Sequence, residues 1–163
     1  MSRIIVAAPI IFCLGTWLAA SAQSGKEGEH MNPPRVRANT KVTVQSSEAR
    51  AYETMSPRLV EIQISEKFSG DIDGESQVRA LQVQRDDKSA SMVSMQRFTG
   101  KLGGRDGAFV LQGEEIVESG KIKATWFVVP GSGTGDLSGL RGEGGFEGGF
   151  GRGSDGWLDY WFE

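Results

Sequence analysis

The chain is very poor in cysteine and histidine, the residues that supply thiol and imidazole groups. Its 163 residues include one cysteine and one histidine. Cys13 lies in the apolar stretch that opens the chain, and His30 lies in a polar stretch close behind it. A Ser-His-Asp triad needs a histidine held against its serine, and zinc sites need several imidazole or thiolate ligands. The sequence therefore argues against thiol, imidazole and redox chemistry, and we expect no metal and no cofactor.

Long apolar runs are also missing, except for one at the N-terminus that has the form of an export signal. Arg3 supplies the positive charge, residues 4–19 are mostly apolar, and a small-residue cleavage site ends at Ala22. Pro9 and Gly15 interrupt the run, which is shorter than a clean membrane-spanning helix. We expect cleavage after Ala22, an exported protein (periplasmic or secreted) and no membrane association after cleavage. A retained membrane anchor is the alternative.

The chain lacks an excess of basic charge. Lysine and arginine number 18 against 21 acidic residues, and no basic stripe stands out, which argues against a nucleic-acid partner. Residues 23–38 are polar and contain glycine and proline, so burial cannot offset their ordering entropy and we expect a flexible leader. Residues 39–163 are long enough to form one domain with a core of its own, without disulfides.

Helical periodicity is absent beyond residue 39, whereas alternation with a period of two recurs. Val60, Ile62 and Ile64 share one face, for example, while polar residues occupy the other. The expected strands span residues 40–44, 60–65, 78–85, 92–102, 108–112, 121–129, 144–146 and 156–163, separated by glycine-rich or polar turns. The polar residues 46–57 are expected to form a long connection. About eight short strands predict an all-β fold, a small antiparallel eight-stranded barrel, with a two-sheet sandwich as the alternative.

Glycine is abundant, above all in the stretch from Trp126 to Gly149, which raises the question of a phosphate-binding loop. A P-loop needs a lysine that reaches the phosphates, and residues 125–163 contain none. We therefore interpret the stretch as a tight corner between strands. Thr134 is expected to cap a single helical turn that directs Leu137 and Leu140 into the core.

Several motifs, in order, resemble one protein family. They are Phe68-Ser69-Gly70-Asp71, Phe98-Thr99-Gly100, Leu102-Gly103-Gly104-Arg105, Phe109-Val110-Leu111-Gln112, the run from Val128 to Gly135, the run from Leu140 to Phe146 and Leu158-Asp159-Tyr160. The set resembles the bacterial domain-of-unknown-function family 3224 from about residue 40 to the end. The Gly-Thr-Gly turn at 133–135 is also similar to the allene oxide cyclase and dirigent barrels.

The resemblance implies a calycin-like, allene oxide cyclase-like eight-stranded barrel with no settled activity. Its distant relatives enclose apolar or phenolic small molecules and steer a reactive intermediate without a metal or redox cofactor. Members of the family often carry a histidine after the Val-Leu-Gln segment, where this chain has Gly113.

Polar residues of the expected barrel interior are the candidates for chemistry. Glu66 has the same parity as Ile62 and Ile64, so it points inward if that face lines the barrel, and Arg97 is then its candidate partner. The alternative is that Glu66 lies at a solvated strand end. Four aromatic residues either line a pocket or fill the barrel, since eight strands enclose a space that is packed solid or holds one small ligand: Trp126, Trp157, Tyr160 and Trp161.

Three functions remain open. The first is an exported barrel that binds a small apolar or aromatic molecule without a cofactor, and the ligand-binding candidates are Glu66, Arg97, Phe109, Leu111, Trp126 and Tyr160. The second is a cofactor-independent isomerase or cyclase, for which the sequence assigns no catalytic residue. The third is a structural module whose aromatic C-terminal strand packs against another copy in a homo-oligomer.

Overall fold

The computed structural model describes residues 33–53, 55–149 and 153–163. The expected signal segment, its cleavage site after Ala22, most of the leader, Cys13 and His30 lie outside this described part. The described residues form nine strands: β1 (Val36–Glu53), β2 (Arg58–Gly70), β3 (Ile72–Asp86), β4 (Ser89–Leu102), β5 (Arg105–Glu118), β6 (Lys121–Val128), β7 (Thr134–Gly135), β8 (Leu140–Gly149) and β9 (Gly153–Phe162). Among these residues there is no helix long and apolar enough to cross a membrane.

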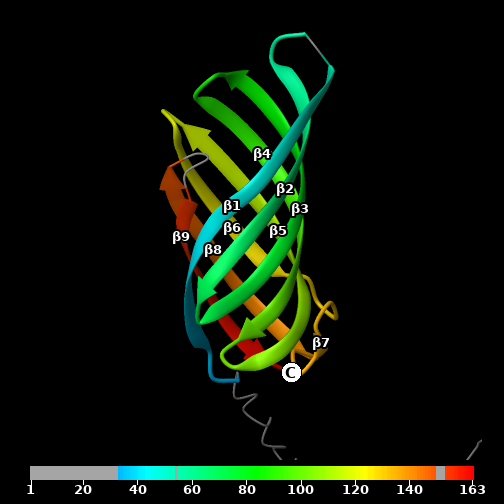
Figure 1. Ribbon diagram of the computed structural model, residues 1–163, viewed down its shortest axis with the longest axis vertical. Helices are drawn as coiled ribbons and strands as arrows, with labels where there is room; N and C mark the ends of the chain where they lie inside the picture. The colour runs from blue at the N-terminus through cyan, green and yellow to red at the C-terminus, as the bar shows by residue number, and fades with distance from the viewer. Residues whose placement is uncertain (1–32, 54, 150–152) are drawn as a thin grey trace, which may run out of the picture. The chain divides into compact units, whose positions relative to one another are not determined.

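The strands form one sheet that closes on itself (Figure 1). The strand order is β4-β3-β2-β1-β9-β8-β6-β5, every pairing is antiparallel, and β4 also pairs with β5. The two-residue strand β7 is added beside β5. The sequence-based prediction of an all-β, eight-stranded antiparallel barrel is confirmed.

The end of the barrel that carries β7 and the chain's C-terminus is packed solid. We call it the β7 end (Figure 1). Phe68, Phe98 and Phe109 are fully buried there, with ring centroids 5.4 Å apart for Phe68 and Phe98 and 4.9 Å apart for Phe98 and Phe109. Leu137 and Leu140 close the same end, and both are fully buried. Aromatic contacts of this kind add to the large apolar area that such rings bury.

The prediction of a helical turn capped by Thr134 is wrong, although Leu137 and Leu140 do point into the core as expected. Thr134 belongs to β7, and its hydroxyl accepts a hydrogen bond from the backbone N–H of Ala108 at 3.2 Å. The backbone then passes through successive turns, in which the N–H of Leu137 donates to the carbonyl of Thr134 at 3.1 Å. These turns place Leu137 and Leu140 in the core without a helix.

The expected connection over residues 46–57 is also wrong, because β1 continues to Glu53. It stays paired with β2 from Ser46, opposite Ser65, to Glu53, opposite Leu59. β1 begins at Val36, three residues before the expected domain boundary. On its other side β1 pairs with β9 only over Val36–Val42. Beyond Val42, β1 therefore extends past Gly149 and Gly153, the last described pair of β8 and β9, at the end opposite β7, which we call the β1–β2 end.

Candidate functional site

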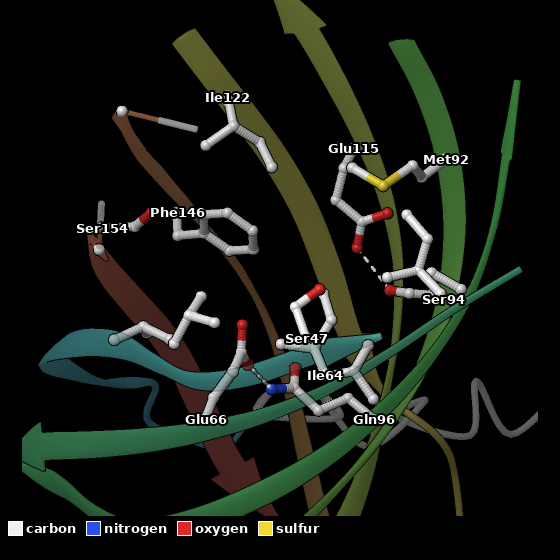
Figure 2. A pocket seen from close by; sticks show the side chains of 17 residues that line it. Ser47, Ile64, Glu66, Met92, Ser94, Gln96, Glu115, Ile122, Phe146 and Ser154 are labelled. Carbon is white, nitrogen blue, oxygen red and sulfur yellow. Dashed lines mark hydrogen bonds between the residues drawn. The ribbon is translucent and has the colours of Figure 1, made fainter. Parts of the chain in front are cut away.

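A cavity of about 210 Å³ lies inside the barrel, toward the β1–β2 end (Figure 2). Strand alternation points every second side chain inward, so the walls come from one face of several strands. Most of the wall is apolar: Val42, Val44, Ile62, Ile64, Val78, Ala80, Met92, Ile122 and Phe146. The polar part consists of Ser47, Glu66, Ser94, Gln96, Glu115 and Ser154, and Gly149 and Gly153 complete the lining.

One carboxyl group of the cavity, that of Glu66 on β2, is held by two neighbouring strands. Ser76 of β3 donates its hydroxyl to Glu66 Oε2 at 3.2 Å, and Gln96 of β4 donates Nε2 to the same oxygen at 2.5 Å. Gln96 Nε2 also lies 2.7 Å from the Ser76 hydroxyl oxygen. Burial raises the pKa of Glu66 above its ordinary value, and the hydrogen bonds from Ser76 and Gln96 oppose this rise.

The second carboxyl group belongs to Glu115 on β5, a residue that is buried. Ser94 of β4 donates its hydroxyl to Glu115 Oε1. Glu115 Oε2 is buried and has no hydrogen-bond partner among the described residues. Burial raises the pKa of Glu115 to about 7; the bond from Ser94 opposes the rise, and the nearby charge of Glu66 adds to it. Figure 2 shows both carboxyl groups directed into the cavity from β2 and β5, with Phe146 on the facing wall.

Comparison with known proteins identifies the barrel's relatives. Residues 38–163 match a family described as "Protein of unknown function (DUF3224)". The chain belongs to this family. A crystal structure at 1.84 Å of a DUF3224 protein with unknown function from Shewanella oneidensis MR-1 is similar, with a TM-score of 0.62 and 25% sequence identity over 80% of this chain and 99% of that one. Among curated proteins, no match to the chain was found.

In this DUF3224 chain, Gly113 makes room for the hydrogen bond between Ser94 and Glu115. A Cβ atom at position 113 would lie 2.9 Å from Glu115 Oε1 and 3.0 Å from the Ser94 hydroxyl oxygen. Ordinary van der Waals contacts are longer, so any larger residue would have to displace one of these groups. The position at which the family resemblance implies a histidine is therefore filled here by a residue that permits the buried carboxyl–hydroxyl pair.

The six ligand-binding candidates from the sequence fall into three places. Glu66 lines the cavity. Phe109, Leu111 and Trp126 belong to the buried cluster at the β7 end, and Tyr160 packs against that cluster. None of these four lines the cavity, although the ring of Trp126 lies 5.2 Å from that of Phe146, which does.

Arg97, the sixth candidate, is exposed on the outer face of the DUF3224 barrel. It lies between Gln96 and Phe98, which are both buried, so alternation along β4 directs its side chain outward. The structure therefore does not bring Arg97 to Glu66. Gln96, the residue before it, contacts Glu66 instead.

Sequence reasoning missed Glu115, Ser94 and Gln96 as cavity residues. The signal that finds Glu115 is parity, because Phe109, Leu111, Gly113, Glu115 and Val117 alternate along β5 and all of them are buried. The expected strand ended at residue 112, which placed Glu115 in the following segment. Among the described residues, no group of three or more His, Cys, Asp and Glu side chains is arranged to hold a metal ion.

Proposed function

We propose that this DUF3224 barrel binds a small, mainly apolar molecule in its cavity. The observation that carries the proposal is a cavity of about 210 Å³ with mainly apolar walls, into which the half-buried carboxyl group of Glu66 and the buried one of Glu115 point. Protein interiors are normally close-packed. Apolar side chains that line such a space lack packing partners on one side, and a ligand that fills the space supplies these contacts.

The size of the cavity limits the ligand. An engineered apolar cavity of about 150 Å³ holds benzene, whereas pockets for drug-sized molecules begin near 300 Å³. The cavity of about 210 Å³ lies between these values and fits one ring with a short substituent. We propose that a ligand enters at the β1–β2 end, where Val44 and Ser47 of β1 and Gly149 of β8 border the cavity.

A pair of matched variants tests whether the cavity is the binding site. Ala80 lines it, whereas the adjacent Leu81 is exposed on the outer face. We expect 2-phenylethanol to bind the full-length protein and to raise its melting temperature. Ala80→Phe should abolish both effects by filling the space, and Leu81→Phe should leave them intact. Binding that survives Ala80→Phe, or no binding of one-ring compounds to the unaltered protein, would contradict the proposal.

The pKa of Glu115 favours a second candidate function, acid–base isomerisation of the bound molecule. A carboxyl group with a pKa of about 7 can both take up and return a proton near neutral pH, the range in which general acid–base catalysis is most efficient. This function predicts that a bound compound is recovered as an isomer, and that Glu115→Gln binds it without converting it. Recovery of every bound compound unchanged would leave binding alone as the function.

A further inference from the structure

The ionisable side chains in the described part of the cavity wall are all acidic. The wall contains two carboxyl groups, from Glu66 and Glu115, and none of the described residues that line it is Lys, Arg or His. Buried charged groups in proteins are normally paired or solvated, because an isolated charge in an apolar environment is strongly unfavourable. The described part of the wall therefore contains two acidic groups and no basic side chain that pairs with them.

The surroundings of Glu115 show the same imbalance. The charged groups that bear on it are both acidic, Glu66 across the cavity and Glu114 on the outer face of β5. Lys123 of the adjacent strand β6 is exposed and forms its ion pair with Glu147 at 2.9 Å. The other residues that the packed strands place around Glu115 are uncharged: Met92, Ser94 and Gln96 of β4, Ile122 and Ala124 of β6, and Phe146 of β8.

The geometry leaves a specific place for a donor. Glu115 Oε1 accepts from Ser94, but Oε2 is buried, belongs to a residue that is only 7% exposed, and has no partner among the described residues. Glu66 Oε2 is already used by Ser76 and Gln96. A group that lies between the two carboxyl groups and donates to both of them would complete the polar part of the cavity.

We propose, building on small-molecule binding in the cavity, that the ligand is an apolar primary amine whose ammonium group lies between Glu115 and Glu66. An ammonium group has three donors and no acceptor, which suits two facing carboxylates. Hydrogen bonds between ionised partners are about twice as strong as neutral ones, so they select for the cation. The apolar part of the amine packs against Ile64, Met92 and Phe146, which line the same space.

Amine binding is coupled to proton release. The pKa of about 7 for Glu115 means that this group is partly protonated near neutral pH. A cation next to it favours the ionised form, so the bound amine drives the proton off. Between pH 5 and pH 8 the affinity for an amine should therefore rise with pH, because the amine stays charged over this range while Glu115 ionises.

Isothermal titration calorimetry on the full-length protein tests the ligand class with two probes of nearly the same shape, 2-phenylethylamine and 2-phenylethanol. At pH 7.5 we expect the amine to bind at least about tenfold more tightly than the alcohol. The enthalpy of amine binding should differ between phosphate and Tris buffers because protons are released. The enthalpy of alcohol binding should be the same in both buffers.

Variants of nearly unchanged shape test whether the charge of the site is what selects the amine. Glu115→Gln should lower the amine affinity at least about tenfold, change the alcohol affinity less than about threefold, and remove most of the buffer dependence. Glu118→Gln, which alters an exposed carboxyl group at the end of the same strand, should change neither affinity. Glu66→Gln provides a second test of the site should Glu115→Gln fold poorly.

The outcomes distinguish this inference from the function on which it rests. Equal affinities for amine and alcohol in the unaltered protein would overturn the amine assignment and leave apolar ligand binding intact. An amine preference that persists in both Glu115→Gln and Glu66→Gln would also overturn the assignment. If neither probe binds, the proposed binding function fails together with the inference.

Discussion

The buried carboxyl group of Glu115 makes a quantitative prediction about stability and pH. In the folded protein its pKa is about 7, whereas the ordinary value for a solvated glutamate is 4.5. Between these two pH values the folded protein binds more protons than the unfolded chain, so the free energy of unfolding falls as the pH rises. The difference in pKa, at about 1.4 kcal/mol per unit, amounts to about 3 kcal/mol lost between pH 4.5 and pH 7.

Replacing Glu115 by glutamine should remove this loss. The amide has nearly the shape of the protonated acid, can still accept the hydrogen bond from Ser94, and does not ionise. At pH 4.5 the variant and the unaltered protein should therefore have similar stabilities. At pH 8 the variant should be more stable by about 3 kcal/mol, because only the unaltered protein carries a buried charge there.

Urea unfolding of both full-length proteins at pH 4.5, 6 and 8 measures the effect. The quantity to compare is the change, between pH 4.5 and pH 8, in the difference between the two free energies of unfolding. A cost of the substitution that does not depend on pH cancels from this change. Glu118→Gln, in which an exposed carboxyl group is lost, serves as the control and should show no such trend. A difference for Glu115→Gln that is the same at all three pH values would refute the reasoning.

Three further predictions follow from the sequence and the packing. Gly113→Ala should lower the free energy of unfolding by about 1–3 kcal/mol in urea titrations, because the new methyl group contacts Glu115 and Ser94. Phe98→Ala should lower it by about 3–5 kcal/mol, because the ring is fully buried between Phe68 and Phe109, and an unfolding midpoint close to that of the unaltered protein would contradict the described core. Exported protein should begin at Gln23 on N-terminal sequencing, whereas a retained anchor would leave the segment before Gln23 attached.

The barrel could be predicted because the physics of a closed antiparallel sheet leaves a clear pattern in the sequence. Alternation in segments such as Val60, Ile62 and Ile64 reports which face of a strand is buried. Alternation of apolar and polar residues does not reveal a strand where both of its faces are exposed. Residues 46–52 of β1 are all exposed, so burial imposes no alternation on them, and hydrogen bonds to β2 hold them in the sheet instead.

The residues of the candidate site can be predicted from parity, the rule that every second residue of a strand points inward, if the rule is applied to every strand. Parity correctly associates Glu66 with Ile62 and Ile64, and all three line the cavity. The same rule applied to β4, where Phe98 points inward, directs Arg97 outward and Gln96 inward. Parity also selects Glu115 once the strand is continued beyond Gly113, where the glycine suggests that the strand ends.

Which part of the barrel is filled and which is open could not be predicted from alternation. Trp126 and Phe109 point inward, as the pattern indicates, but they pack at the β7 end and not around the cavity. The position of the cavity depends on where short side chains such as those of Ala80 and Ser94 meet in three dimensions. That depends on the register between neighbouring strands, which no single strand's sequence contains.

The most direct test of the account is to locate a bound probe by intermolecular nuclear Overhauser effects. With 2-phenylethylamine and methyl-labelled full-length protein, we predict contacts from the ring protons to the methyl groups of Ile62, Ile64 and Met92, which line the cavity. Contacts confined to the outer-face methyl groups of Leu81, Val93 and Met95, or none at all, would contradict binding inside the barrel.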